Sequence, residues 1–174
     1  MEIGEGFEGA GADAAHVNTV LGAREGAVGT AWATALATPS AGHTPFICVL
    51  QPGLPIKPLT LFVNKAAIAG TLHANLTWGA AQCGVAGGVA DAVAEGVIDR
   101  QAADALLLIA AVWVAPDAAD AERVYRNNRA ATRLALEAGR RGDPALDRVL
   151  AARHAPENPF FRPRSARATE EVSR

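Results

Sequence analysis

The sequence predicts an α+β domain with a mostly antiparallel sheet covered by helices. Extended apolar runs alternate with helical patterns along the 174 residues, and the first two extended runs are separated only by a short loop, as in paired antiparallel strands. Half of the residues are hydrophobic, which suits one domain with a substantial core. No G-x-G-x-x-G follows a predicted strand and no G-x-x-x-x-G-K-[ST] occurs, so a nucleotide-binding fold is not predicted.

The N-terminal part of the chain predicts two strands followed by a helix. Residues 2–9 alternate crudely between polar and apolar positions, and residues 16–22 form a second extended run. We expect these runs to be neighbouring strands, joined by the Gly-Ala-Gly-Ala-Asp loop. Residues 26–38 then predict a helix that Pro39 and Ser40 close. The apolar positions on one face of this helix are Val28, Trp32, Ala35 and Leu36.

Two further extended runs are joined by a segment rich in proline. The runs cover residues 45–50 and 59–68, and residues 51–58 between them contain three prolines. Proline holds its φ near about −65° and cannot donate a hydrogen bond to a neighbouring strand. We therefore expect residues 51–58 to form a fixed loop.

The segment of residues 71–97 is rich in alanine and predicts a helix in spite of five glycines. Each glycine lowers helix propensity by up to about 1 kcal/mol relative to alanine. We expect close packing against a sheet or a sister subunit to offset this loss, and Gly96 to end the helix. Small side chains leave little apolar area per residue, and chains of this kind often gain burial by forming oligomers.

The remaining elements are a strand, a long helix and a tail. Residues 106–114 are continuously apolar and predict a buried strand, and residues 118–140 predict an amphipathic helix with Asp117 at its N-cap. A short helix over residues 145–153 fits the pattern. We expect one domain over residues 1–150 and a mobile tail over residues 151–174, where prolines and scattered charges leave little apolar spacing.

Charge and cysteine content exclude several classes of partner. The formal net charge is −2, and no basic cluster lies in the folded part, which argues against a nucleic-acid partner. The N-terminus is acidic where a secretory signal would be basic, and no apolar run reaches the roughly 18 residues of a membrane span. We therefore expect a cytoplasmic protein with no membrane partner. Cys48 and Cys83 are then expected as reduced thiols, with Cys48 buried in an apolar run.

One imidazole and one amide stand two residues apart in an otherwise apolar run. His16 and Asn18 lie within Ala14-Ala15-His16-Val17-Asn18-Thr19-Val20, and in a strand this spacing places both side chains on the same face. An imidazole that titrates near neutrality suits proton transfer at the mouth of a pocket. The alternative is a core or surface histidine whose hydrogen bonds are satisfied.

A series of short motifs in a fixed order extends this interpretation. After His16 come Gly42-His43-Thr44-Pro45, Pro52-Gly53-Leu54-Pro55-Ile56-Lys57-Pro58, Thr60-Leu61-Phe62-Val63-Asn64-Lys65, Trp78-Gly79-Ala80-Ala81-Gln82 and Val89-Ala90-Asp91-Ala92-Val93-Ala94-Glu95-Gly96. The series resembles the formaldehyde-activating enzyme family, which condenses formaldehyde with tetrahydromethanopterin, from about Ile3 to about Gly142. The resemblance implies a fold like ribosomal protein S5 domain 2, a homopentameric ring and active sites at subunit contacts.

The resemblance also implies a set of site residues. His16 matches the family's proposed general acid/base. The positions that match the family's pterin-contacting residues are Asn18, Ile47, Lys65, Ala67 and Gln82. Lys65 and Gln82 match by residue type, with a solvated strand-end lysine and a helix-surface glutamine as the alternatives, and Ile47 replaces a leucine. Asn18 stands where the family has aspartate and Ala67 where it commonly has threonine, so a negative charge and a hydroxyl are missing. The four histidines are too far apart for a local metal motif.

Three functions follow as hypotheses. The first is a carbon–oxygen hydro-lyase of one-carbon metabolism and formaldehyde detoxification. It would condense formaldehyde with tetrahydromethanopterin, or a related reduced pterin, to the methylene derivative and release water, with the pterin as co-substrate and no permanently bound cofactor. The second is a non-catalytic pterin- or folate-binding homologue, which the changes at Asn18 and Ala67 would permit. The third is thiol-based formaldehyde handling through Cys83.

Overall fold

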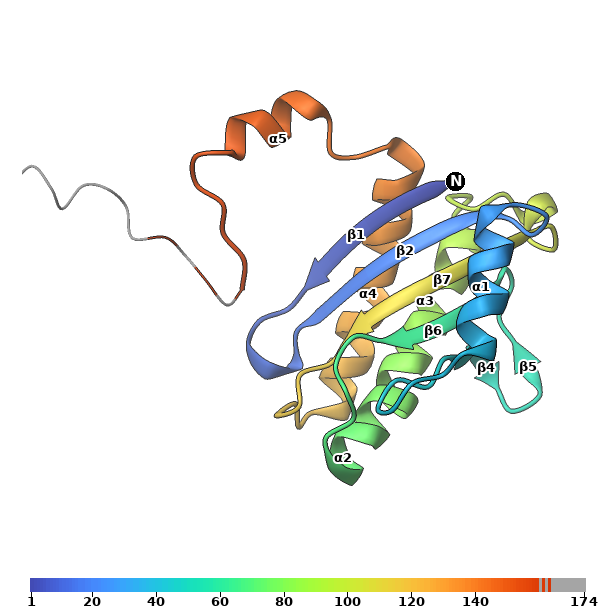
Figure 1. The fold of residues 1–174 in the computed structure, drawn as a ribbon, viewed down its shortest axis with the longest axis horizontal. Helices are drawn as coiled ribbons and strands as arrows, with labels where there is room; N and C mark the ends of the chain where they lie inside the picture. The colour runs from blue at the N-terminus through green and yellow to red at the C-terminus, as the bar shows by residue number, and fades with distance from the viewer. Residues whose placement is uncertain (160, 162, 164–174) are drawn as a thin grey trace, which may run out of the picture. The chain divides into compact units, whose positions relative to one another are not determined.

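A computed structural model describes residues 1–159, 161 and 163 of the chain. The chain divides into two units, Met1–Asp143 and Pro144–Arg174. The first unit holds the sheet and the helices around it (Figure 1). The second contains helix α5, Leu146–Ala152. The tail expected over residues 151–174 lies partly outside the described residues.

The first unit is built on a five-stranded sheet with the order β1-β2-β7-β6-β3. All neighbouring strands are antiparallel except β6 and β7, which are parallel. This arrangement confirms the predicted α+β class with a mostly antiparallel sheet. The strands are β1 Glu2–Glu8, β2 Ala15–Ala23, β3 Phe46–Ile47, β6 Leu59–Asn64 and β7 Leu106–Trp113. A 3-10 turn, Gly11–Asp13, lies between β1 and β2.

The proline-rich segment differs from the fixed loop that the sequence predicts. Its residues Leu54–Pro55 form strand β5, which pairs with β4, Val49–Gln51, in a separate two-stranded sheet. Proline is tolerated there because an edge strand does not need every N–H. The backbone N–H of Ile56 donates to the carbonyl of Cys48 (3.2 Å) and continues the pairing.

The helices follow the predicted ranges with two corrections. They are α1 Ala27–Ala37, α2 Gly70–Asn75, a π-helical turn Leu76–Ala81, α3 Gln82–Ala94, a 3-10 turn Arg100–Ala102 and α4 Ala121–Arg141. The single helix predicted over residues 71–97 is thus three consecutive helical pieces, and Gly96 follows them with φ +80°. The N-cap of α4 is Asp120 rather than Asp117, because the Asp120 carboxylate accepts the Arg123 backbone N–H at 3.0 Å.

The helices cover the two faces of the sheet unequally. In Figure 1, α1 lies in front of the sheet, and α3 and α4 lie behind it. A Cβ on Gly22 of β2 would come within 2.7 Å of the Val28 side chain of α1. Because alternate residues of a strand share a face, His16 and Asn18 lie on the α1 side of the sheet with Gly22. Among the helices described in the first unit, α1 alone lies on this side, and within that unit part of the face stays open.

Glycines allow α4 to contact β1 and α3 directly. A Cβ on Gly4 of β1 would stand 1.7 Å from the carbonyl oxygen of Ala135, and one on Gly6 would stand 2.1 Å from that of Ala131. On α3, a Cβ on Gly84 or Gly88 would come within 2.4 to 2.5 Å of α4 carbonyl oxygens. The predicted close packing of the glycine-bearing helix is confirmed, but Gly84 and Gly88 pack against helix α4 and not against the sheet or the sister subunit that the sequence suggested.

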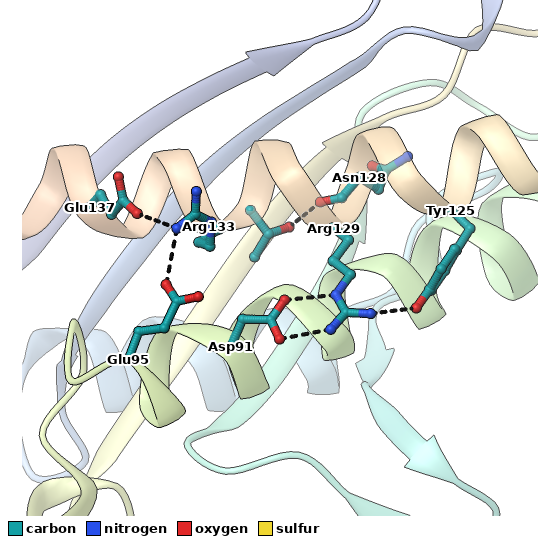
Figure 2. A network of polar contacts seen from close by, with 8 residues as sticks. Asp91, Glu95, Tyr125, Asn128, Arg129, Arg133 and Glu137 are labelled. Carbon is teal, nitrogen blue, oxygen red and sulfur yellow. Dashed lines mark hydrogen bonds and ion pairs between the residues drawn. The ribbon is translucent and has the colours of Figure 1, made fainter.

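Polar side chains tie α3 to α4 at their exposed edge (Figure 2). The Arg129 guanidinium on α4 donates two hydrogen bonds to the Asp91 carboxylate on α3, both at 2.7 Å, and one to the Tyr125 hydroxyl at 2.9 Å. These hydrogen bonds hold the pKa of Asp91 below its ordinary value. Arg133 pairs with Glu95 through a single nitrogen, Nη1, at 3.0 Å. Such partly exposed pairs contribute little stability individually, but the bidentate geometry fixes the register of the two helices.

Both cysteines are free thiols. Cys48 is completely buried, as the sequence predicts, and burial raises the pKa of its thiol to about 12. Each helix in the described part of the chain is too short or too polar to cross a membrane.

Candidate active site

The open part of the α1-side face gathers four polar side chains from three strands. Glu5 on β1 stands opposite Asn18 on β2, and His16 on β2 stands opposite Trp113 on β7. Lys65 follows β6, and its backbone N–H donates to the carbonyl of Val112 at 2.8 Å, which continues the β6–β7 ladder by one residue. The sheet register therefore places Glu5, His16, Asn18 and Lys65 on one face, and we call these four residues the polar cluster.

His16 is held by a carboxylate and remains accessible. Its Nε2 lies 3.0 Å from Oε1 of Glu5, and the side chains of His16 and Glu5 are 39% and 60% exposed. The ring of Phe7 flanks the imidazole, with the ring centroids 6.3 Å apart. Burial and the positive charge of Lys65 lower the pKa of His16 below 6.5, while Glu5 opposes this shift. The lowered pKa favours the neutral imidazole, which can take a proton and, once protonated, give it to a leaving group.

The buried histidine of this domain provides a contrast. His73 on α2 is 1% exposed. Its Nδ1 accepts the backbone N–H of Ala69 at 3.0 Å, and its Nε2 lies 3.0 Å from the carbonyl of Val114, to which it donates. Both ring nitrogens thus form hydrogen bonds with backbone groups, as in a core histidine whose hydrogen bonds are satisfied. His16 differs because its carboxylate partner is exposed and its ring faces the open side of the sheet.

Lys65 reaches across β7 to the residues of β2. Its Nζ donates to Oδ1 of Asn18 at 2.5 Å and to the backbone carbonyl of His16 at 3.2 Å. Burial lowers the pKa of Lys65 to about 8, although the negative charge of Glu5 opposes the shift. The alternative of a freely solvated strand-end lysine is therefore wrong. Lys65 is a half-buried amine in contact with the two residues that the sequence singles out on β2.

Ile47 and Ala67 lie near the edge of the same region. Ile47 on β3 pairs with Leu61 on β6, and Leu61 pairs with Ile109 on β7. Paired residues point to the same face of a sheet, so Ile47 lies on the α1 side, two strands away from β7. Ala67 is exposed, and its Cβ lies 3.0 Å from where a Cβ on Gly42 would stand. The Gly42 turn is fastened there by Asn64, whose side-chain amide donates to the carbonyls of Gly42 and Ala66, both at 2.7 Å.

Gln82 is not brought to His16 within this chain. It opens α3, on the opposite side of the sheet, and is 4% exposed. Its Oε1 accepts the backbone N–H of Val49 and its Nε2 donates to the carbonyl of the same residue, both at 3.0 Å. The alternative of a helix-surface glutamine is wrong, because this amide is buried and anchors strand β4.

Sequence reasoning missed Glu5 as a member of the cluster. The segment Gly4-Glu5-Gly6 contained an indication of this role. Gly4 and Gly6 face α4, so the side chain of Glu5 between them must point to the opposite, α1 side of the sheet. However, only the pairing of β1 with β2 shows that this carboxylate meets His16. Among residues 1–159, 161 and 163, no group of three or more His, Cys, Asp or Glu side chains is arranged to hold a metal ion.

We expect Glu5→Gln to lower the pKa of His16 further below 6.5. The carboxylate supplies the attraction and the hydrogen bond that favour the imidazolium, and a neutral amide supplies much less. NMR titration of the His16 ring protons measures the change. Glu8→Gln is the matched control, because Glu8 lies on the same strand but its side chain points to the opposite face of the sheet. An unchanged or raised His16 pKa in Glu5→Gln would contradict the pairing.

Comparison with known proteins supplies the context for this cluster. A family model described as formaldehyde-activating enzyme (Fae) matches residues 3–161. A 5,6,7,8-tetrahydromethanopterin hydro-lyase of Methanosarcina barkeri is 40% identical over 158 residues, which are 91% of this chain and 89% of the relative.

Other similar proteins are longer. A bifunctional enzyme Fae/Hps of Methanococcoides burtonii is 45% identical over 150 residues, which are 86% of this chain and 38% of the relative. A protein of the same description from Archaeoglobus fulgidus is 40% identical over 160 residues, which are 92% of this chain and 41% of the relative. The chain thus spans about two fifths of the length of these bifunctional relatives.

Proposed function

The chain belongs to the formaldehyde-activating enzyme family, and from this premise we propose that it condenses formaldehyde with tetrahydromethanopterin, or a related reduced pterin, to the methylene derivative and water. The observation that supports the proposal is the polar cluster. It places an accessible imidazole, oriented by a carboxylate at 3.0 Å, beside a half-buried amine on an open sheet face.

The proposed reaction needs a proton at its slow step. A secondary amine of the pterin adds to formaldehyde and forms a carbinolamine, whose hydroxyl must leave before the second nitrogen can close the ring. Hydroxide is a poor leaving group, so a general acid within about 2.6–3.2 Å of the departing oxygen accelerates the step by roughly 10²–10⁴-fold. We assign this role to His16, with Glu5 as the residue that orients its ring.

The remaining site residues are proposed to bind the pterin. Lys65 and Asn18 offer a donor and an amide beside His16, while Ile47 and Ala67 provide apolar surface. Gln82 lies behind the sheet, so in this chain it acts on the pterin only indirectly, by fixing the backbone of Val49, or on a pterin bound at another subunit.

We further propose that the functional species is a homopentamer with a site at each subunit contact. On the α1-side face, exposed apolar side chains of β1 stand on either side of Glu5, with Ile3 57% and Phe7 39% exposed. Such residues gain burial when a second copy covers them. Light scattering of the purified protein at micromolar concentration is expected to give the mass of five subunits. Monomers alone would overturn the proposed assembly.

The wild-type catalysed rate tests the reaction itself. Purified protein is mixed with formaldehyde and tetrahydromethanopterin, or with tetrahydrofolate, and methylene-pterin formation is compared with the spontaneous background. We expect a rate above background with at least one pterin. Pterin binding without any catalysed rate would favour the non-catalytic homologue instead.

Handling of formaldehyde by a thiol is the third hypothesis, and Cys83→Ala separates it from the proposed reaction. Cys83 is exposed on α3, on the side of the sheet away from His16. We expect Cys83→Ala to leave the catalysed rate unchanged. A loss of about tenfold or more, about 1.4 kcal/mol in the barrier, would support the thiol route.

A further inference from the structure

Lysine is rare in this chain, and one of its two lysines belongs to the polar cluster. Of sixteen Lys and Arg residues, only Lys57 and Lys65 are lysines. Lys57 forms an ion pair with Asp104 at 2.7 Å, with the two side chains 50% and 85% exposed. Lys65 instead contacts the residues of β2 beside His16. Primary amines add readily to the carbon of formaldehyde, so the side chains of these two lysines can react with it.

The contacts of Lys65 suit a neutral amine. A neutral amine has two N–H donors and one lone pair, and Nζ donates to two oxygens, Oδ1 of Asn18 and the backbone carbonyl of His16. Both acceptors are neutral, so they stabilise the ammonium less than a carboxylate would. The Glu5 carboxylate is engaged with His16. An aspartate at position 18 would favour the ammonium form of Lys65 more strongly than the neutral amide of Asn18 does.

The lowered pKa of Lys65 agrees with this geometry. Its pKa of about 8 reflects burial. Roughly a tenth of the Lys65 side chains are then neutral at pH 7, compared with fewer than about one in a thousand for an ordinary lysine of pKa about 10.4. The groups that act on Nζ are Glu5 from β1, and His16 and Asn18 from β2. Among these, Glu5 carries the negative charge that opposes the neutral form.

We propose that Lys65 is a covalent nucleophile that captures formaldehyde and passes the carbon to the pterin. This proposal rests on the proposed condensation and adds a residue that bonds to the reacting carbon. Its structural basis is the position of Nζ, which is half-buried, bonded to two neutral acceptors and adjacent to the residue assigned as the general acid.

The capture proceeds in two balanced steps. The lone pair of Nζ forms a C–N bond with the formaldehyde carbon while the carbonyl π electrons move to oxygen, and a proton moves from nitrogen to that oxygen to give a carbinolamine. His16 then protonates the hydroxyl, the C–O bond breaks and water leaves. The nitrogen lone pair forms the second C–N bond, which leaves a methylene iminium on Lys65.

Transfer to the pterin regenerates the lysine. One pterin nitrogen attacks the iminium carbon and loses its proton, which gives an aminal between Lys65 and the pterin. Protonation of Nζ lets the neutral amine depart as the pterin nitrogen forms an iminium, and the second pterin nitrogen closes the ring with loss of its proton. The two pterin N–H protons thus balance those carried away in the water, and no oxidant or reductant is required.

Reductive trapping tests the capture, with Lys57 as an internal control. The wild-type protein is incubated with isotopically labelled formaldehyde and cyanoborohydride, which reduces an iminium to a methylated amine, and the lysine-bearing peptides are followed by mass spectrometry. We expect labelling of Lys65 to exceed that of Lys57 by about tenfold or more near pH 7, because burial lowers the pKa of Lys65 and its Nζ lies beside the proposed general acid. Adding the pterin should lower the Lys65 signal selectively. Equal labelling, or label at Lys57 alone, would overturn the proposal.

Kinetics of matched variants test the capture a second time, while the labelling of Lys65 separates capture from simple pterin binding. Lys65→Arg keeps a charge and N–H donors but removes the nucleophile, so we expect its catalysed rate to fall by about tenfold or more. Lys57→Arg is the control and should retain the wild-type rate. A wild-type rate in Lys65→Arg would overturn capture while leaving the condensation intact. Selective labelling of Lys65 without any catalysed rate would instead support capture and contradict the condensation.

Discussion

His16→Ala is expected to lower the catalysed rate of methylene-pterin formation by about 100-fold or more, because the general acid acts mainly in the transition state. The imidazole is 39% exposed and bonds to a carboxylate on the surface, so its loss should leave the fold and the assembly intact. Pterin affinity should change little. Rates and affinities of wild type and variant, measured side by side, check this expectation.

A second histidine variant controls for the substitution itself. His154→Ala removes an exposed histidine from the second unit and should leave the rate unchanged. Equal and appreciable rates in wild type and His16→Ala would remove His16 from the proposed mechanism. If the wild type shows no rate above background and His16→Ala alters affinity alone, the non-catalytic interpretation holds.

Gly4→Ala is expected to destabilise the protein by about 3 kcal/mol or more. The new Cβ would stand 1.7 Å from the carbonyl oxygen of Ala135 and 2.9 Å from the backbone nitrogen of Gly139. Backbone atoms cannot rotate away as a flexible side chain can, so α4 must move off β1 and forfeit buried contacts. Urea denaturation measures the free energy of unfolding.

The same substitution at an open position provides the control. A Cβ on Gly79 would meet nothing within 4 Å, and Gly79 lies in the π-helical turn Leu76–Ala81. Gly79→Ala should therefore be neutral, or stabilising by up to about 1 kcal/mol because alanine favours helices. Equal stabilities of Gly4→Ala and wild type would show that β1 and α4 are not in the close contact described at Gly4.

The corrections to the predicted elements have two different physical origins. Asp117 and Asp120 are both suitable caps by residue type, and the choice depends on where the chain turns into α4, where Asp13 also accepts the backbone N–H of Asp120 at 3.1 Å. Residues 51–58 carry prolines that predict a loop, yet Leu54–Pro55 pairs with β4 because an edge strand leaves some N–H positions unused. At the start of α4 the deciding contact comes from the sequence-distant Asp13, whereas β4 and β5 are close in the sequence and form a local pair that the prolines masked.

The sequence by itself determined the succession of strands and helices, the α+β class and the placement of His16 and Asn18 on one strand face. These properties depend on periodicities of two and about 3.6 residues, which are local and survive in a single sequence. The local sequence pattern also identified the glycines of residues 71–97 as positions that permit close packing of this helical segment. The motif order also determined the resemblance that the family match confirms.

Only the tertiary structure decided which side chains meet. The pairing of β1 with β2 brings Glu5 to His16, and the parallel pairing of β6 with β7 brings Lys65 to Asn18. The packing of α3 behind the sheet takes Gln82 away from them. Strand order and register arise from burial of the whole core, and local sequence leaves them open, because a shift of one residue would move each side chain to the other face.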